Sequence, residues 1–396
     1  MTGRPGAVYL CYFPISDPLV DSQVLAYMRG LAADGFRIHL ITFELSLKPE
    51  AEILIRDRLE RDRITWSCLY YRPGGSLLQK CGEGLRGVGR LIRVILKNDL
   101  QIVHARAHPA ALMAYPVARL LRRKLLFDVR GLIADEYADI GRWSRSGYLF
   151  RGVKRAETFL LRHADAIVFL TRAIVSDLVS RKTLRTEDVA KVTVIPCCVD
   201  IPRAPVGEGR REFVLAYVGK LGSWYLDEEI LRFFVAVRRV RPGARLLVLT
   251  QSPGDPLRER LALLGVSDRD VWIGAVAHSE VSSRLQEASA GVAFYRPGYS
   301  KLATSPTKVG DYLAAGLPVA INASIGDCDL MLRENSVGVS LQDFSELEIE
   351  RSAVRLVALA EEAGIRDRCR EVARKELDLA AIGVARYRAI YEKLGS

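Results

Sequence analysis

Short apolar runs alternate with stretches of helical spacing along the first two hundred residues. Residues 8–13 and 36–43 predict buried strands. Between them, residues 23–34 place apolar side chains at helical spacing and end at Gly35. The alternation continues through predicted strands at 102–104, 125–129, 166–170 and 192–195, with helices at 110–121 and from Asp135 to Arg162. Strands that alternate with helices in this way predict a doubly wound α/β domain.

A second α/β alternation follows a segment rich in proline and glycine at residues 201–209, which predicts a domain boundary. Its predicted strands are 213–218, 245–250, 271–274 and 291–295, and its predicted helices are 228–240, 257–264 and 281–288. We therefore expect two Rossmann-like doubly wound domains facing each other across a cleft, at residues 1–200 and 205–378. Residues 379–396 are expected to form a C-terminal helix that returns to the N-terminal domain.

Residues 304–321 predict a helix followed by a buried strand. Ser305 is a suitable N-cap and Pro306 suits the first helical position, whereas Gly316 suits the left-handed position that ends a helix. The start of such a helix attracts anions, and Lys308 adds a full positive charge there. Asp311 lies one turn further on, so a phosphate and a sugar hydroxyl could bind together. The alternative is an ordinary capped surface helix with a solvated Lys–Asp pair.

Polar side chains also follow several predicted strands of the first domain, where ligands of parallel sheets gather. His104, Arg106, Arg130 and Thr171 are expected just past such strand ends. A structural role for His104 is the alternative. The loop at residues 14–22 lacks the G-x-G-x-x-G fingerprint, so we expect no nicotinamide or flavin cofactor.

The positive charge of the chain is concentrated in its N-terminal half. Residues 1–204 hold 32 Lys and Arg against 21 Asp and Glu, whereas residues 205–396 hold 26 of each. The basic residues are mixed with apolar ones, as in residues 90–97 and 119–126, which suits an anionic membrane surface or an anionic acceptor. Ordinary solvated helix faces are the alternative. No nucleic-acid-binding motif is present, so we expect no nucleic-acid partner.

The lack of a recognisable targeting signal, together with the cysteine usage, predicts a cytoplasmic protein. No apolar run is long enough for a transmembrane helix, and the first predicted strand is too short for a secretory signal. The seven cysteines show no C-x-x-C spacing, which is typical of a reduced compartment and predicts no structural zinc.

Six motifs, in order along the chain, resemble those of the GT-B glycosyltransferases of glycosyltransferase family 4. The first is His104 after an Ile-Val strand, and the second is Asp128-Val-Arg130-Gly131. The third, Ile195-Pro-Cys-Cys-Val-Asp200, is similar to the family's Ile-Pro-Asn-Gly-Val-Asp. Val218-Gly219-Lys220-Leu221 resembles its Val-Gly-Arg-Leu, and Trp272-Ile-Gly274-Ala-Val276 its Phe-x-Gly-x-Val. Residues 305–319 resemble its nucleotide-sugar motif. The likeness covers nearly the whole chain.

The resemblance implies retaining transfer of a hexose-type sugar from a UDP- or GDP-sugar, without an essential metal or other cofactor. The C-terminal domain would hold the donor and the N-terminal domain a glycan or polyprenyl-linked acceptor. Lys220 and Lys308 would bind the diphosphate, Asp311 the ribose hydroxyls, and His104 the transferred sugar, with Arg130 on the catalytic face. The other expected donor contacts are Gly219, Gly274, Val276, Thr304, Ser305, Pro306 and Thr307.

Three departures from the family pattern mark a divergent subgroup. Ala303 replaces a motif glutamate, and loop amides around Thr304 and Ser305 are expected to substitute for it. Tyr225-Leu226 stands where the family has Lys-Gly, and the N-terminal loop has no Gly-Gly pair. Two alternatives to a transferase stay open at this point. They are a nucleotide-sugar 2-epimerase of the same fold and a non-catalytic glycosyltransferase-like subunit. Our leading expectation is an enzyme of cell-surface polysaccharide or glycolipid synthesis, peripheral on the inner membrane face.

Overall fold

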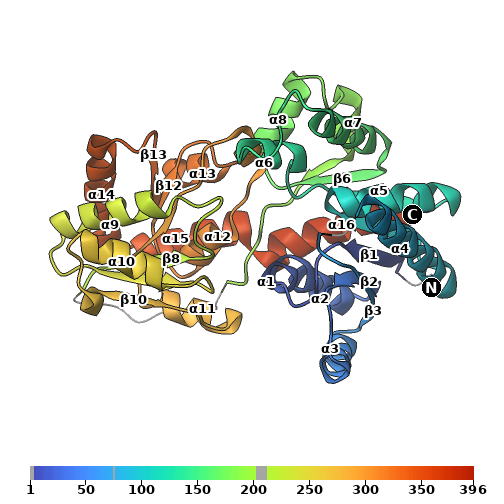
Figure 1. The fold of residues 1–396 in the computed structure, drawn as a ribbon, viewed down its shortest axis with the longest axis horizontal. Coiled ribbons are helices and arrows are strands. Elements are labelled where there is room, and N and C mark those ends of the chain that lie inside the picture. Colours follow the sequence, from blue (N-terminus) through green and yellow to red (C-terminus); the bar gives the residue numbers. More distant parts are fainter. Residues whose placement is uncertain (1–3, 75, 202–211) are drawn as a thin grey trace. The chain divides into compact units, whose positions relative to one another are not determined.

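The computed structural model describes residues 4–74, 76–201 and 212–396, and the chain divides into two compact units. Unit 1 contains residues 1–196 and 379–396, and unit 2 contains residues 197–378. Most of the predicted linker, residues 202–209, lies outside the described residues. Figure 1 traces both units in sequence colours. Each unit is built on a parallel sheet with helices on its faces, so the predicted α/β class is confirmed.

Unit 1 is organised around a sheet that, in the described residues, has seven strands in the order β3-β2-β1-β4-β5-β6-β7. All neighbours pair in parallel. The strands are β1 (Gly6–Cys11), β2 (Arg37–Glu44), β3 (Ile64–Tyr70), β4 (Ile102–Arg106), β5 (Lys124–Asp128), β6 (Ala166–Phe169) and β7 (Val192–Val194). The central strands β1, β4 and β5 are almost entirely buried, which explains their continuous apolar sequences.

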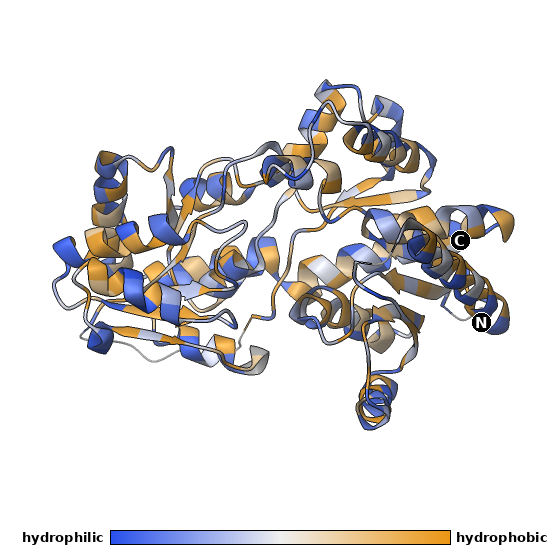
Figure 2. Cartoon of the chain, viewed as in Figure 1, coloured by the Kyte–Doolittle hydropathy of each residue, from blue (hydrophilic) through white to orange (hydrophobic). Residues whose placement is uncertain are grey.

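The helices of unit 1 are amphipathic and cover both faces of this sheet. They are α1 (Pro18–Val20), α2 (Ala26–Ala33), α3 (Pro49–Arg61), α4 (Leu77–Asn98), α5 (Ala107–Leu120), α6 (Ile133–Asp139), α7 (Tyr148–His163), α8 (Arg172–Ser180) and α16 (Ala385–Gly395). Short π-helices precede α2 (Asp21–Leu25) and α16 (Leu379–Val384), and a 3₁₀ helix (Thr186–Lys191) precedes β7. Figure 2 shows mostly apolar strands and helices with faces of both kinds.

The C-terminal helix belongs to unit 1 and is tied to it by side-chain hydrogen bonds. Tyr387 donates its hydroxyl hydrogen to Asp128 Oδ2 at 3.0 Å, and Arg388 donates to Asp34 at 2.6 Å. Tyr391 is fully buried and its hydroxyl lies 2.9 Å from His104 Nδ1. The prediction that this helix returns to the N-terminal sheet is therefore confirmed.

Unit 2 is built on a second parallel sheet, which has six strands within the described residues, in the order β10-β9-β8-β11-β12-β13. The strands are β8 (Val214–Val218), β9 (Arg245–Leu249), β10 (Val271–Gly274), β11 (Ala290–Ala293), β12 (Val319–Asn322) and β13 (Gly338–Leu341). Apolar side chains from this sheet and its helices form two core clusters, one on each face.

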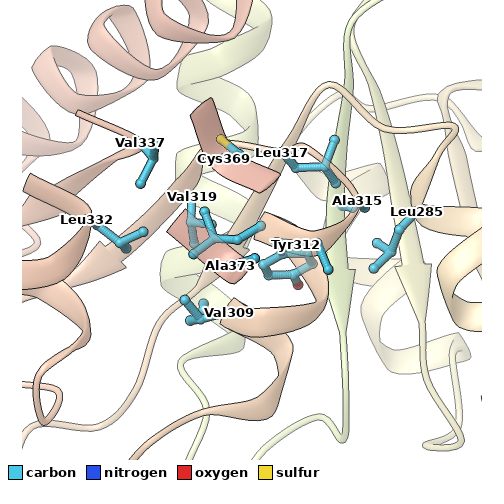
Figure 3. Close-up of a cluster of buried hydrophobic side chains, with 14 of the residues drawn as sticks. Leu285, Val309, Tyr312, Ala315, Leu317, Val319, Leu332, Val337, Cys369 and Ala373 are labelled. Atoms are coloured by element: carbon cyan, nitrogen blue, oxygen red, sulfur yellow. The ribbon is translucent and has the colours of Figure 1, made fainter. Parts of the chain in front are cut away.

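The α-helices of unit 2 are α9 (Asp227–Val240), α10 (Asp255–Leu263), α11 (His278–Leu285), α12 (Thr307–Ala314), α13 (Cys328–Glu334), α14 (Glu346–Glu361) and α15 (Ile365–Leu377). Two 3₁₀ helices, Asp268–Asp270 and Tyr299–Ala303, complete the unit. Figure 3 shows Val309 and Tyr312 of α12 among apolar side chains that include Val319 of β12 and Ala373 of α15. Helix α12 is thus held rigidly in the core.

The end of α12 forms as its sequence predicts, and its start does not. Gly316 has φ of 81°, and the Gly316 and Leu317 amides donate to the Leu313 and Tyr312 carbonyls, which is the Schellman arrangement. At the start, Pro306 occupies the N-cap and makes no side-chain bond. The N-cap prediction for Ser305 is wrong because its hydroxyl accepts a hydrogen bond from the Cys197 amide at 3.0 Å.

Candidate functional site

Lys308 is the most unusual charged residue of unit 2. It lies in the first turn of α12 and is only 7% exposed, and its Nζ makes no hydrogen bond. Three tyrosine rings surround the ammonium group: Nζ lies 4.0 Å from the ring centre of Tyr225, 4.3 Å from Tyr217 and 5.6 Å from Tyr295. Contact with aromatic faces stabilises a cation only partly, and the positive end of a helix disfavours it.

Burial is the main influence on the ionisation of Lys308. It lowers the pKa of the amine from 10.5 to about 7, against the opposing attraction of Asp227 and Asp311. Burial likewise raises the pKa of Asp311 to about 7, and Lys308 opposes that shift. The solvated Lys–Asp pair considered from the sequence does not form, because Lys308 Nζ has no hydrogen-bond partner. A bound anion would supply the partner that the folded chain does not.

The loop after β8 passes directly over Lys308. Gly219 has φ of 133°, and a methyl group built on it would lie 2.8 Å from Lys308 Nζ, so only glycine leaves room for the ammonium group. Lys220 is exposed, and its carbonyl accepts a hydrogen bond from the Tyr217 hydroxyl at 2.5 Å. The loop is fastened further by the Gly222 amide, which donates to Asp227 at 2.7 Å.

Tyr312 fixes α12, and with it Lys308, against the sheet. Its hydroxyl accepts from the Val218 amide at 2.8 Å and donates to the Val292 carbonyl at 3.1 Å. The β8 end, which leads into the Gly219 loop, and helix α12 are therefore joined by one buried side chain. This arrangement positions a backbone loop and a buried cation next to each other.

The other predicted donor contacts of unit 2 have the following places. Thr307 and Asp311 lie in α12 and are half-buried, and Thr304 is half-buried just before it. Gly274 ends β10, and Val276 packs at the margin of a core cluster. Ala303 is buried in a 3₁₀ helix. The Thr304 amide donates to the Lys301 carbonyl at 3.0 Å, so it does not replace the missing glutamate as predicted.

Two arginines of unit 1 meet at the carboxyl ends of β4 and β5. Arg106 and Arg130 both donate to Gln23 Oε1, at 2.9 and 2.7 Å, and both are nearly buried. Arg130 has φ of 60° and Ala107 has φ of 63°, conformations that non-glycine residues adopt mostly under constraint. Strain and buried charge at strand ends are typical of functional sites. The strand-end placement predicted for Arg130 is confirmed.

Asp128 lies behind these arginines in the core of unit 1. It is fully buried, and its Oδ2 lies 3.9 Å from an Arg130 nitrogen and 3.7 Å from His104 Nε2. Burial is the largest single influence and would raise the pKa of Asp128. The positive charge of Arg130, the contact with His104 and the charge of Arg106 together outweigh it, so the pKa lies below its usual value. Asp128 is therefore an ionised anchor for the arginine.

His104 does not lie past a strand end, as was predicted, but inside β4. Its side chain is fully buried and packs against Tyr9, with ring centres 4.2 Å apart, and against Tyr387 and Tyr391 of α16. Burial lowers its pKa. Because the C-terminal helix covers the ring, the prediction that His104 contacts the transferred sugar is corrected to a role in the core.

A pocket of about 580 Å³ opens in unit 1 beside α4 and the ends of β2 and β3. Glu83 lines it and is only 4% exposed. Its Oε1 accepts from the Arg72 amide at 2.9 Å, and its Oε2 makes no hydrogen bond. Tyr70, Tyr71, Gln79 and Arg86 also line it. A buried carboxylate beside aromatic rings offers a hydrogen-bond acceptor and an apolar platform, which suits a hydroxyl-bearing ligand.

The family model named Glycosyltransferase Family 4 matches residues 20–203, which include the strand ends of unit 1 just described. This match covers a little under half of the chain, and over that segment the chain is similar to Family 4. The two parallel-sheet units are those of the GT-B fold. A comparison with curated protein sequences finds no match.

Solved structures of glycosyltransferases share the fold of this chain over nearly its whole length. A glycosyltransferase from Rickettsia africae has a TM-score of 0.73 and 12% identity, covering 99% of this chain and 98% of its own. Sucrose-phosphate synthase from Thermosynechococcus elongatus has a TM-score of 0.70 and 14% identity over 99% of each chain. Anabaena HepE, solved with UDP and glucose, has a TM-score of 0.69 and 14% identity, covering 98% and 99%.

Several site residues were missed by the sequence reading. Tyr217 and Tyr295 enclose Lys308 only after folding, and Gln23 reaches Arg106 and Arg130 from a distant helix. Glu83 carried one usable signal, because it is the single carboxylate in a long basic helix. Among the residues that the structure describes, no group of three or more His, Cys, Asp and Glu is placed to hold a metal ion.

Proposed function

We propose that this chain is a Family 4 glycosyltransferase, which transfers a hexose-type sugar, with retention of configuration, from a nucleoside-diphosphate sugar to a glycan or lipid-linked acceptor. The observation that carries the donor half is Lys308, a buried cation with no hydrogen-bond partner beside the Gly219 loop. A desolvated charge costs free energy until an opposite charge arrives, so this site favours an anionic ligand. A nucleoside diphosphate has the required charge.

In this proposal the leaving diphosphate lies between Lys308 and Lys220. Negative charge on the diphosphate grows as the bond to the sugar breaks, and fixed cations in a dry site then stabilise the transition state more than the ground state. Because the two lysines supply that charge, we propose that no metal is essential. Asp311 would accept hydrogen bonds from the ribose hydroxyls, with further donor contacts from Thr304 to Thr307, Gly274 and Val276.

The Tyr225 substitution supports Lys308 as the main cation. Where the family pattern has lysine, this chain has Tyr225, and the Tyr225 ring lies 4.0 Å from Lys308 Nζ. In place of a charged side chain, the loop after β8 thus provides an aromatic ring that contacts the charge of Lys308 on α12. The Anabaena HepE complex with UDP and glucose makes UDP-glucose the first donor to test, ahead of GDP-sugars.

The acceptor would bind to unit 1. Arg106 and Arg130 offer guanidinium groups at the strand ends, and the Glu83 pocket offers a separate place for a sugar unit of the acceptor. The basic excess of the N-terminal half supports an acceptor held at an anionic membrane surface, so we propose a cytoplasmic enzyme peripheral on the inner membrane face. No helix within the described ranges is long and apolar enough to cross a bilayer.

A donor panel tests the proposal. The purified full chain is mixed with UDP- and GDP-sugars and thermal stability is recorded, because a bound ligand raises it by mass action. We expect UDP-glucose or a related donor to raise Tm, and nucleotide release with a membrane lipid extract, also in EDTA. NMR of the product reports retention. Epimerised donor without acceptor would support the 2-epimerase instead, and binding of no donor would support a non-catalytic subunit.

A further inference from the structure

The long helix α4 presents an apolar stripe to solvent. Leu78, Leu85 and Leu96 are 85%, 72% and 59% exposed, and half-buried Ile92 lies between the last two. At about 100° per residue, these four positions fall within an arc of about 40° on one side of the helix. Exposed leucines are common singly, but a stripe along a helix of 22 residues marks an interaction surface.

A row of cations flanks the leucine stripe along α4. Arg86, Arg93 and Lys97 are exposed, and lie about 100° round the helix from the leucine stripe. None of the three forms an ion pair with a carboxylate in the described parts of the chain. The helix contains a single acidic residue, Glu83, which is buried. The exposed surface of α4 is therefore apolar and positive, with no negative charge.

We propose that this surface of α4 docks on an anionic lipid bilayer. The leucines would insert at the boundary between headgroups and acyl chains, and the basic row would lie against the lipid phosphates. An apolar stripe beside a basic row is complementary to a bilayer surface in both respects. Helix α4 carries too many charges to cross a bilayer, and it does not meet the criterion for a membrane-spanning helix. It lies on the surface.

Docking by α4 would also place the Glu83 pocket at the membrane. Gln79, Gly82, Glu83 and Arg86 of this helix line the pocket, on the flank of the leucine stripe. A lipid-linked acceptor would then reach the pocket while its lipid stays in the bilayer. This consequence rests on the proposed transfer to such an acceptor, whereas docking itself can be measured without any turnover.

Vesicle binding tests the docking surface on the full chain. The probes are vesicles of phosphatidylcholine with 30% phosphatidylglycerol and vesicles of phosphatidylcholine alone, each sedimented with protein in 50 and 500 mM NaCl. We expect binding to the anionic vesicles that weakens at high salt. A Leu78→Ser/Leu85→Ser/Leu96→Ser variant should bind at least tenfold more weakly. Arg93→Gln/Lys97→Gln should bind more weakly and with a smaller salt dependence.

Two control variants match these changes elsewhere on the surface. Leu263 of α10 is 88% exposed, so Leu263→Ser removes a comparable leucine. Arg351→Gln/Arg355→Gln on α14 removes the same charge from exposed positions. Both controls should bind the vesicles as the original chain does. Circular dichroism and the Tm of each variant show whether it is folded.

Three outcomes would overturn the docking proposal. They are no binding of the original chain to anionic vesicles, equal binding of the leucine variant, or a dimer in light scattering that the leucine variant abolishes. The last result would make the stripe an interface between two copies. Donor-induced thermal shifts are measured on the same samples. If the original chain does not bind vesicles but UDP-glucose still raises its Tm, only the docking proposal is contradicted. If UDP-glucose does not raise the Tm of the original chain, only the proposed function is contradicted.

Discussion

The two units hold their buried cations in opposite ways. In unit 1, the Arg130 guanidinium donates to Gln23 and lies beside ionised Asp128, which α16 in turn supports. In unit 2, the Lys308 ammonium group meets three aromatic rings and makes no hydrogen bond. The first arrangement fixes a side chain within the fold. The second leaves a charge whose partner would be a ligand. The first arrangement therefore suits the positioning of a side chain, and the second suits the binding of an anion.

Replacement of Lys308 should have the largest effect. Lys308→Met removes the charge at similar volume, and we expect turnover to fall roughly 10²-fold because a preorganised electrostatic contact is lost. The same variant should be more stable to unfolding by about 1–3 kcal/mol, since a buried charge is removed. Steady-state kinetics and urea unfolding measure the two effects. Lys375→Met, at an exposed position of α15, is the control, and a near-normal rate for Lys308→Met would contradict the donor assignment.

Removal of the Asp128 charge should produce the converse result in unit 1. Asp128→Asn leaves the Arg130 guanidinium buried beside a neutral side chain, so we expect a loss of about 3 kcal/mol in the free energy of unfolding of unit 1. UDP-glucose binding to unit 2 should change little. Asp34→Asn, which breaks a partly exposed ion pair with Arg388, should cost less than about 1 kcal/mol. Equal losses in the two variants would mean that Asp128 is no special anchor.

The pH dependence of donor binding should follow the pKa of Lys308. That amine titrates at about 7 in the free enzyme, and a bound diphosphate stabilises its protonated form. Affinity for UDP should therefore fall as the pH rises above 7, by up to about tenfold per unit. Calorimetry from pH 6.5 to 8.5 measures it. Lys308→Met should abolish this dependence. Because burial also raises the pKa of Asp311 to about 7, Asp311→Asn is the control, and this variant should keep the dependence. A flat profile in the original chain would contradict the assignment.

Loss of a single hydrogen bond to Asp128 should have the smallest effect. Tyr387→Phe removes the donor at 3.0 Å and should lower the free energy of unfolding by about 1 kcal/mol. Tyr148→Phe, at a residue 80% exposed, should have no measurable effect. Thermal unfolding followed by circular dichroism compares the two. An unchanged Tyr387→Phe variant would show that Arg130 and His104 suffice to hold Asp128.

The fold could be predicted from sequence wherever the signal is local. Apolar runs of strand length and helical spacing located most elements of both sheets, and Gly316 with Pro318 predicted the end of α12 because backbone conformation is set by neighbours in sequence. Strand β3 was missed. It is an edge strand with only Ile64 and Trp66 buried, so its apolar pattern is weak. Helix α4 was recognised only as a basic cluster.

The candidate site was predictable only in part, because its contacts join distant segments. Lys308 was identified from its helix start, but the tyrosines around it come from the ends of β8 and β11 and the loop between β8 and α9. Ser305 looked like a cap and instead accepts from Cys197, more than a hundred residues away. His104 was predicted to contact the substrate because the helix that covers it, α16, lies far away in the sequence. Contacts between residues so far apart in sequence leave no signal in the local pattern of apolar and polar residues.

The discontinuity of unit 1 has a consequence for synthesis on the ribosome. Unit 2 is one continuous segment whose ends meet, since the Val199 amide donates to the Leu377 carbonyl at 2.9 Å. Unit 1 needs residues 379–396 to cover His104 and to bond Asp128. Domains commonly fold in the order of their synthesis. Here unit 2 can fold before unit 1, because unit 1 is complete only after residues 379–396 have been translated.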